Sequence, residues 1–186
     1  MNESVKKLLG ELESFEKKNG GFFNVPPETG KFLYNLVCSS KAKNILEIGT
    51  SNGYSSIWLG EAAAKTGGKV TTIEIAENKA EMAMLNFKRA GLSDRIKIIR
   101  GDAIKEIPKL KESYDFMFID AIKKDYISYF KLAFPNLKKN AVITADNAII
   151  FAKKMEEYLS LVRNHKYLSS VLIPIGTGVE FTVKIV

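Results

Sequence analysis

Acidic side chains stand at the ends of the strands that the central part of this sequence predicts. Five short apolar runs end in an acid or are followed at once by one: Glu47, Glu74, Asp102, Asp120 and Asp146, the last with Asn147 behind it. The carboxyl ends of parallel strands lie on one edge of a sheet, and ligands of open α/β sheets bind at that edge. We therefore expect these side chains to share one rim, because solvation alone does not explain so many acids at strand ends.

Three side chains at these strand ends would supply a metal ion with oxygen ligands only, which indicates a hard cation. Asp120, Asp146 and Asn147 offer carboxylate and amide oxygens, and Mg²⁺ takes such ligands together with water and substrate oxygens. The only histidine is His165, which we expect on the surface late in the last helix. A histidine-rich metal site and a Ser-His-Asp triad are therefore excluded. The sequence predicts a divalent metal site, with Mg²⁺ as the first choice.

Lys123 follows Asp120 by three residues and is expected on the loop above the same rim. Near a divalent cation, in a partly dry pocket, the pKa of a lysine falls, so that it can act as a general base. The alternative is an ordinary surface lysine, since the chain has 28 Lys and Arg residues. Lys124 is expected to face solvent.

A glycine turn links the strand expected over Asn44–Ile48 to a helix that starts near Tyr54. A dinucleotide fingerprint would read G-x-G-x-x-G, but here its first position is Glu47 and its last glycine is delayed to Gly53. A carboxylate there would repel a diphosphate and suits a ligand with an ammonium and a sulfonium group, namely S-adenosylmethionine (SAM). Glu74 ends the next strand about 20 residues later, where an acid accepts the ribose hydroxyls. The alternative is a tight turn that binds no cofactor.

Strands alternate with helices along most of the chain, which predicts right-handed crossovers and a parallel sheet. Gly176-Thr177-Gly178 separates two runs rich in β-branched residues, so the sheet should end in an antiparallel hairpin. Val5, Leu8, Leu9, Leu12 and Phe15 recur at helical spacing. The other expected helices begin at Pro27, span Lys79–Ala90 (with Met82, Leu85 and Phe87), Ile104–Leu110 and Tyr126–Leu137, and run from Ile149 to Asn164.

Length and composition predict one domain. The chain has 186 residues, of which 46% are hydrophobic and 26% charged; we expect an amphipathic helix within residues 1–22 and a core over 23–186. No apolar run approaches the ~20 residues that span a bilayer, and the N-terminus does not resemble a signal peptide. The single cysteine, Cys38, fits a core position and a reducing cytoplasm. A net charge of +7 permits contact with RNA, but the basic residues are dispersed.

The sequence resembles the class I SAM-dependent methyltransferases, and within them the metal-dependent O-methyltransferases of the catechol and caffeoyl-CoA type. The resemblance implies a Rossmann-like fold with a mostly parallel seven-stranded sheet, helices on both faces and an antiparallel C-terminal strand. The stretches that carry it are LEIGTSNGYS (46–55), VTTIEI (70–75), RGDA (100–103), FIDAIKKDY (118–126), ADN (145–147) and IPIGTGV (173–179). The FIDA-x-K stretch with the later DN pair is the more specific part.

The resemblance implies a role for each matching residue. Asp120, Asp146 and Asn147 would bind the metal, and Lys123 would accept the proton of the acceptor hydroxyl. Val25 would cover the methionine end of SAM, Glu74 would hold the ribose, and Asp102, Ala103 and Ile122 would contact the adenine. The cofactor-binding set is Val25, Glu47, Gly49, Gly53, Tyr54, Ser55, Glu74, Ile75, Gly101, Asp102, Ala103, Asp120 and Ile122.

Two departures from the family leave the methyl acceptor open. Ile122 stands where relatives often have an acidic or aromatic residue, and few residues separate Asn147 from the helix expected at Ile149. We therefore expect an open acceptor pocket, or one completed by a second subunit of a homodimer. The first hypothesis is transfer to a vicinal-dihydroxy small molecule such as a catechol. The others are transfer to a hydroxylated uridine of tRNA, and a SAM-binding domain without catalysis.

Overall fold

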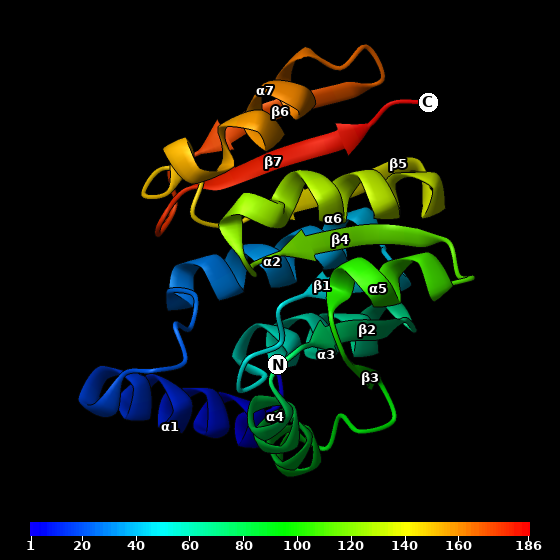
Figure 1. Ribbon diagram of the computed structural model, residues 1–186. Helices are drawn as coiled ribbons and strands as arrows, with labels where there is room; N and C mark the ends of the chain where they lie inside the picture. Colours follow the sequence, from blue (N-terminus) through cyan, green and yellow to red (C-terminus); the bar gives the residue numbers. More distant parts are fainter.

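The computed structural model describes residues 1–186 as a seven-stranded sheet between two layers of helices (Figure 1). The strand order is β3-β2-β1-β4-β5-β7-β6, with β7 antiparallel to both of its neighbours and the other adjacent pairs parallel. The strands are β1 (Asn44–Ile48), β2 (Lys69–Glu74), β3 (Ile96–Arg100), β4 (Tyr114–Ile119), β5 (Leu137–Ala145), β6 (Leu168–Ile173) and β7 (Val179–Lys184). The predicted sheet is confirmed, including its antiparallel C-terminal strand.

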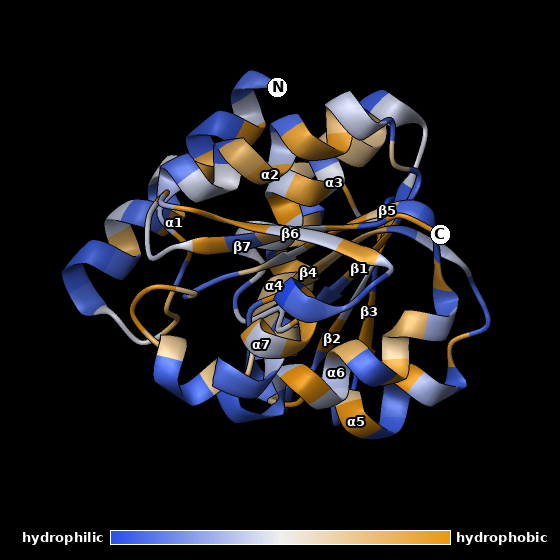
Figure 2. Cartoon of the chain, turned by 90° about the horizontal axis from the view of Figure 1, so that it is seen from above, coloured by the Kyte–Doolittle hydropathy of each residue, from blue (hydrophilic) through white to orange (hydrophobic).

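The helices divide between the two faces of the sheet (Figure 2). The α-helices are α1 (Glu3–Asn19), α2 (Pro27–Ser40), α3 (Tyr54–Thr66), α4 (Glu77–Ala90), α5 (Ala103–Glu106), α6 (Tyr126–Ala133) and α7 (Glu156–Asn164). Short 3₁₀ turns are η1 (Ile107–Lys109), η2 (Lys123–Asp125), η3 (Phe134–Asn136) and η4 (Ala152–Met155). Helices α1 to α4 pack on one face and α5 to α7 on the other, so successive strand residues such as Ile45 and Leu46 belong to different cores.

The first helix packs on its own chain. Val5, Leu8, Leu9 and Leu12 are buried in the same core as α2 and α3, and Asn2 caps the helix by accepting a hydrogen bond from the Ser4 amide. This burial is favourable because apolar surface leaves water. Four of the five apolar residues that recur along α1 are therefore covered within the chain, whereas the fifth, Phe15, is 49% exposed. No helix is both long and apolar enough to cross a bilayer.

The buried face of α4 consists mostly of small residues. Met82 and Leu85 are exposed, and the buried positions besides Phe87 are held mainly by small residues: Ala80, Ala83, Asn86 and Ala90. The physical reason is close approach, because a Cβ added to Gly53 would lie 2.6 Å from the Phe87 ring and 3.3 Å from the Cα atom of Ala83. Larger side chains on this face would not fit beside the glycine turn.

The helix expected from Ile149 begins only at Glu156, after a turn and the short η4. The amides of Ala148, Ile149 and Ile150 donate to the carbonyl groups of Thr177 and Gly178, and not to carbonyl groups within a helix. These amides are satisfied across the chain, so the apolar spacing after Asn147 does not produce a helix there. The segment between Asn147 and α7 is accordingly longer than expected, which corrects the inference of a short loop at this place.

Candidate active site

The ends of β1, β4 and β5 lie side by side and bring the glycine turn against the predicted metal ligands. The Asp120 amide donates to the Ile48 carbonyl (2.9 Å), and the Asp146 amide donates to the Ile119 carbonyl (3.0 Å). Gly49 has φ +96°, and a Cβ atom there would lie 2.1 Å from the Asp120 carbonyl oxygen. Only glycine allows this approach of two backbones. The predicted cofactor turn and the predicted metal site are thus direct neighbours.

Two carboxylates and one ammonium form the centre of this rim. Lys123 Nζ donates to Asp120 Oδ1 at 2.7 Å, and both side chains are only 16% exposed. Burial raises the pKa of Asp120, while the neighbouring Lys123 ammonium lowers it. Burial first, and then the charge of Asp120, raise the pKa of Asp146 to about 7. Two buried carboxyl groups thus face a single ammonium, and burial together with the neighbouring charge disfavours the ionised form of Asp146.

This arrangement fits a hard divalent cation. Asn147 Nδ2 donates to Asp146 Oδ2 at 2.9 Å, so the amide directs its nitrogen toward that carboxylate and leaves its oxygen without a hydrogen bond in the chain. The structure contains no cluster of three or more His, Cys, Asp and Glu side chains suited to a metal ion. The amide oxygen of Asn147 is the further protein oxygen beside Asp120 and Asp146, and carboxylate and amide oxygens, completed by water, suit Mg²⁺.

The carboxylate of Glu74 closes the glycine turn from the side of β2. Its oxygens accept the amides of Ser51 (2.7 Å) and Ala76 (2.9 Å), and each retains acceptor capacity for a further donor. Ser51 Oγ donates to the Phe22 carbonyl at 2.8 Å, which ties the segment before α2 to the turn. Asn24, in that segment, has both amide atoms buried without a partner. Such an orphaned amide next to Val25 fits a polar ligand at this place.

Apolar side chains line the same rim beside Glu74. Ile75, Ile104 and Ile122 follow β2, β3 and β4 and are 63%, 39% and 49% exposed. Gly101 donates its amide to the Glu74 carbonyl at 2.8 Å, and Asp102 caps α5 through the Ile104 amide at 3.0 Å. Exposed isoleucines next to polar groups suit a flat heteroaromatic ring, because burial of their surface is favourable.

Two residues expected to touch a cofactor have other roles here. Glu47 is fully buried, and its carboxylate accepts hydrogen bonds from Ser55 Oγ (2.6 Å) and Ser56 Oγ. Tyr54 is buried as well, and its hydroxyl donates to Glu13 of α1 at 2.6 Å. A ligand cannot reach the Glu47 carboxylate in this conformation, and Glu47 instead holds the start of α3, which follows the glycine turn. The Tyr54 side chain links α3 to α1.

Glu47 should make the stability of the unliganded protein depend on pH. Burial raises its pKa to about 7, against the hydrogen bonds that favour the charged form. The unfolded carboxyl ionises near 4.5, so the folded state binds more protons between these values and the free energy of unfolding falls as the pH rises through them. We expect the free energy of unfolding of Glu47→Gln, relative to that of the wild type, to increase by about 3 kcal/mol as the pH rises from 4.5 to 8. Urea unfolding at several pH values, without SAM or metal, measures this, and a constant difference would contradict it.

Two residues at the rim, Thr177 and Asn24, have no functional signal of their own in the sequence. Thr177 contacts both Asp146 and Asn147, although it lies about 30 residues beyond them. It belongs to the IPIGTGV stretch, whose position in the hairpin next to β5 could have indicated it. Asn24 gave no sequence signal apart from its place before Val25.

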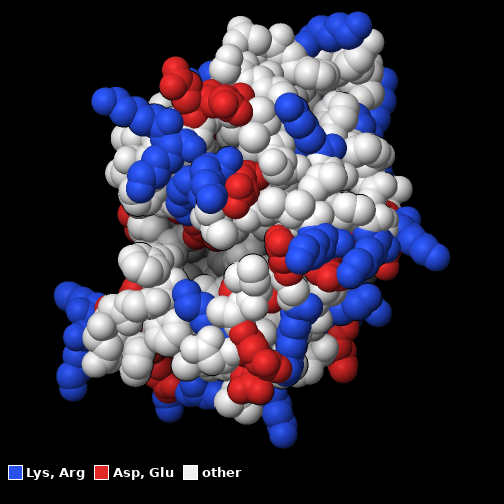
Figure 3. All heavy atoms as spheres, viewed as in Figure 1, with Lys and Arg blue, Asp and Glu red and all other residues white.

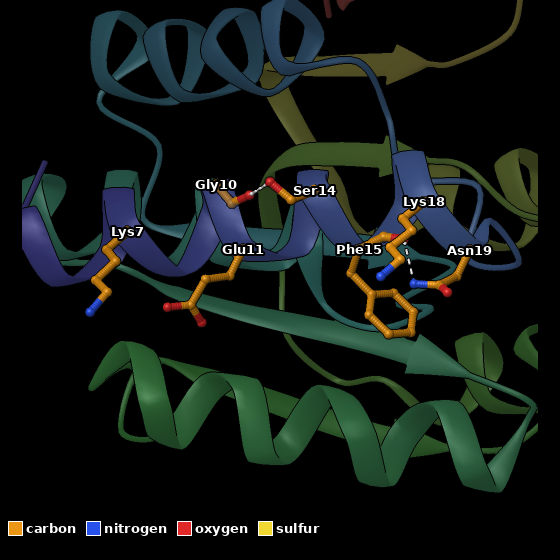
Figure 4. Close-up of a pocket in the computed structure, with 7 residues that line it drawn as sticks. All are labelled: Lys7, Gly10, Glu11, Ser14, Phe15, Lys18 and Asn19. Atoms are coloured by element: carbon orange, nitrogen blue, oxygen red, sulfur yellow. Dashed lines mark hydrogen bonds between the residues drawn. The ribbon is translucent and has the colours of Figure 1, made fainter.

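Other surface features lie apart from this rim. A shallow groove on α1 is lined by residues of that single helix (Figure 4): Lys7, Gly10, Glu11, Ser14, Phe15, Lys18 and Asn19. It brings together no groups from different elements. Basic side chains gather on the face that carries the starts of α6 and α7 (Figure 3). Two adjacent lysine pairs lie in this region, Lys123-Lys124 on η2 and Lys153-Lys154 on η4, and the two turns contact each other.

Comparison with known sequences finds relatives that are all O-methyltransferases. The sequence model of the O-methyltransferase family matches residues 2–184. A catechol O-methyltransferase of Niastella koreensis is 38% identical over 154 residues, which cover 81% of this chain and 69% of that protein. A catechol O-methyltransferase of Mycobacterium tuberculosis is 39% identical over 126 residues, and there the match covers 67% of this chain but only 57% of the relative.

Solved structures resemble the whole chain. An O-methyltransferase from Bacillus cereus in complex with S-adenosylhomocysteine (SAH) has a TM-score of 0.84 at 28% identity, over 99% of this chain and 91% of that one. The O-methyltransferase TomG from Streptomyces achromogenes, involved in tomaymycin synthesis and in complex with SAM, has a TM-score of 0.87 at 25% identity. It covers 100% of this chain and 91% of TomG.

Proposed function

Because this chain belongs to the O-methyltransferase family, we propose that it transfers the methyl group of SAM to one hydroxyl of a vicinal-dihydroxy small molecule of the catechol type. The transfer requires a divalent cation, with Mg²⁺ as the first choice. Asp120, Asp146 and Asn147 are the proposed ligands of this cation.

One juxtaposition carries the proposal. The glycine turn begins at Gly49, which lies against the Asp120 backbone. The turn is therefore directly beside the rim that holds both buried carboxylates and Lys123. SAM bound at the glycine turn and a methyl acceptor bound at the rim would be direct neighbours. Such proximity accounts for a large part of the rate of a bimolecular transfer. The names of the relatives support the catechol class as acceptor.

Lys123 is the proposed proton acceptor. When bound, a divalent cation lowers the pKa of an adjacent hydroxyl and neutralises the charge of Asp120 and Asp146. The acceptor oxygen then forms its bond to the methyl carbon while the carbon–sulfur bond breaks, and the bonding electrons remain on sulfur. The hydroxyl proton passes to Nζ of Lys123, which must first leave the 2.7 Å ion pair with Asp120 and release its own proton to solvent before it can act as the base.

Glu74 is the proposed ribose acceptor, and its charge should matter for cofactor affinity. We expect Glu74→Gln to weaken the binding of S-adenosylhomocysteine about 10- to 100-fold, since hydrogen bonds to a charged group contribute about 1.5–3 kcal/mol. Isothermal titration measures the effect. Glu77→Gln is the matched control, because Glu77 lies in the first turn of α4, where it pairs with Arg100 at 3.1 Å on the surface. Equal affinities of Glu74→Gln and the wild type would contradict the assignment.

A turnover experiment tests the proposal as a whole. Purified protein is incubated with methyl-labelled SAM and catechol, with Mg²⁺ or after treatment with a chelator. We expect labelled mono-O-methylated product only with the divalent ion. SAM binding without turnover of any methyl acceptor, small molecule or tRNA, across several divalent ions, would leave only a binding function.

A tRNA nucleoside is the second candidate acceptor, because lysines surround the proposed acceptor side of the rim. Lys124 and Lys153 lie on the two contacting turns and have no ion-pair partner, and cations at a site's edge attract a phosphate backbone. Electrophoretic retardation of tRNA that weakens steeply with salt would favour this acceptor. Migration of tRNA that the protein does not change would count against it.

A further inference from the structure

We propose that Thr177, at the tip of the β6–β7 hairpin, is a positioning residue that orients Asp146 and Asn147 for metal binding. The inference rests on the metal site of the proposed function. It concerns a residue about 30 positions away in sequence, on a different element from both ligands. Its basis is a set of side-chain and main-chain contacts that all converge on the Asp146–Asn147 pair.

The Thr177 hydroxyl joins the two proposed ligands. Its Oγ1 lies 3.0 Å from each carboxylate oxygen of Asp146, and Asn147 Nδ2 lies 2.9 Å from the same Oγ1. A hydroxyl has one proton to donate and also accepts, whereas an ionised carboxylate only accepts and an amide nitrogen only donates. The direction of both bonds is therefore fixed: Thr177 donates to Asp146 and accepts from Asn147.

This direction determines which end of the Asn147 amide is available. Nitrogen and oxygen of an amide exchange places when the group rotates by half a turn, and only the hydrogen-bond network selects one orientation. Here Asp146 Oδ2 and Thr177 Oγ1 both take the nitrogen. The oxygen, which is the metal-binding atom, is left free. Without the hydroxyl, a single contact to Asp146 would hold the orientation.

The main chain of the hairpin holds the same segment. The amides of Ile149 (3.1 Å) and Ile150 (3.4 Å) donate to the Thr177 carbonyl, and the Ala148 amide donates to the Gly178 carbonyl at 2.8 Å. Gly178 has φ +90°, and a Cβ atom there would lie 2.7 Å from the Ile149 nitrogen. These contacts leave Asn147 in the left-handed region, at φ +67°, where asparagine is tolerated better than most residues. The hairpin tip therefore fixes both backbone and side chains of the ligand pair.

Metal affinity, measured apart from turnover, tests the role. The variants are Thr177→Val, which keeps the shape and removes the hydroxyl, and Thr177→Ser, which keeps the hydroxyl. Thr182→Val is the matched control, since Thr182 is a buried residue of β7 whose hydroxyl contacts Ser170 at 2.7 Å. Mn²⁺ binding is followed by electron paramagnetic resonance of the free ion, SAH binding by isothermal titration, and folding by the melting temperature.

We expect Thr177→Val to weaken Mn²⁺ binding about 10- to 100-fold, as loss of a group that orients metal ligands generally does, while SAH affinity stays within about twofold of the wild type. Thr177→Ser should recover most of the loss, and Thr182→Val should bind Mn²⁺ as the wild type does. Wild-type Mn²⁺ affinity in a folded Thr177→Val protein would overturn the inference while leaving the proposed function intact. Absence of Mn²⁺ binding by the wild-type protein would instead overturn the metal site itself, and this inference with it.

Discussion

Replacement of Asp146 by alanine should lower divalent-dependent turnover about 10²- to 10⁴-fold while SAM affinity stays within about twofold. The reason is that Asp146 is one of only two carboxylates at the proposed metal site, and the charge stabilisation that a metal supplies amounts to several kcal/mol. The Asp146 side chain forms hydrogen bonds with Asn147 and Thr177 and none with the glycine turn. Initial rates over a range of Mg²⁺ concentrations, together with titration of SAM, measure the two effects.

The control for this variant is Asp94→Ala. Asp94 is an exposed acid before β3, at the opposite end of the sheet, so its loss should change neither quantity. Asp146→Ala with full divalent-dependent activity would contradict the metal assignment. A parallel loss of SAM binding would contradict the separation of the metal and cofactor sites.

Replacement of Lys123 by methionine should lower kcat about 10²- to 10⁴-fold, the usual contribution of a positioned general base. Methionine keeps much of the apolar length that packs beside Tyr126 and Phe151, whose ring centroids lie 5.3 and 6.0 Å from Nζ. Mn²⁺ affinity should stay equal or increase, because the variant removes an ammonium that competes for Asp120 at 2.7 Å. Loss of kcat without loss of metal binding separates a base from a structural lysine.

The pH dependence of this variant gives a second criterion. Without the base, turnover must await ionisation of the acceptor itself, so the residual rate should increase with pH up to the pKa of the metal-bound hydroxyl, which lies below the value near 10 of a free phenol. The deficit relative to the wild type should shrink accordingly. Lys131→Met, on the exposed side of α6, is the control. A deficit that is the same at pH 7 and pH 9.5 would argue that Lys123 acts through structure alone.

Local patterns in the sequence were sufficient for the sheet and for the meeting of the strand ends. Short apolar runs that end in Glu74, Asp120 and Asp146 specify parallel strands, and the topology of such a sheet then places their ends on one edge. The hairpin signal at Gly176 and Gly178 predicted the antiparallel strand in the same way. These features depend on spacing within about ten residues, which a sequence shows directly.

Features that depend on how the elements pack against one another in three dimensions were not predictable. Glu47 has a ligand-like position in the motif, but its burial follows from Ser55 and Ser56 folding back over it. The apolar residues after Asn147 have helical spacing, yet their amides pair with the hairpin about 30 residues further on. Met82 and Leu85 are the larger apolar residues of α4, but the close approach of this helix to Gly53 selects alanines for its buried face. In each case tertiary packing overrides a local preference.

Diffraction from crystals grown with Mn²⁺ and SAH, collected at the manganese absorption edge, tests the metal site most directly. The proposed function predicts one strong anomalous peak whose nearest protein atoms are oxygens of Asp120, Asp146 and Asn147, with the amide oxygen of Asn147 facing the metal and Lys123 released from Asp120. A peak elsewhere, or a metal that binds without these three side chains, would contradict it.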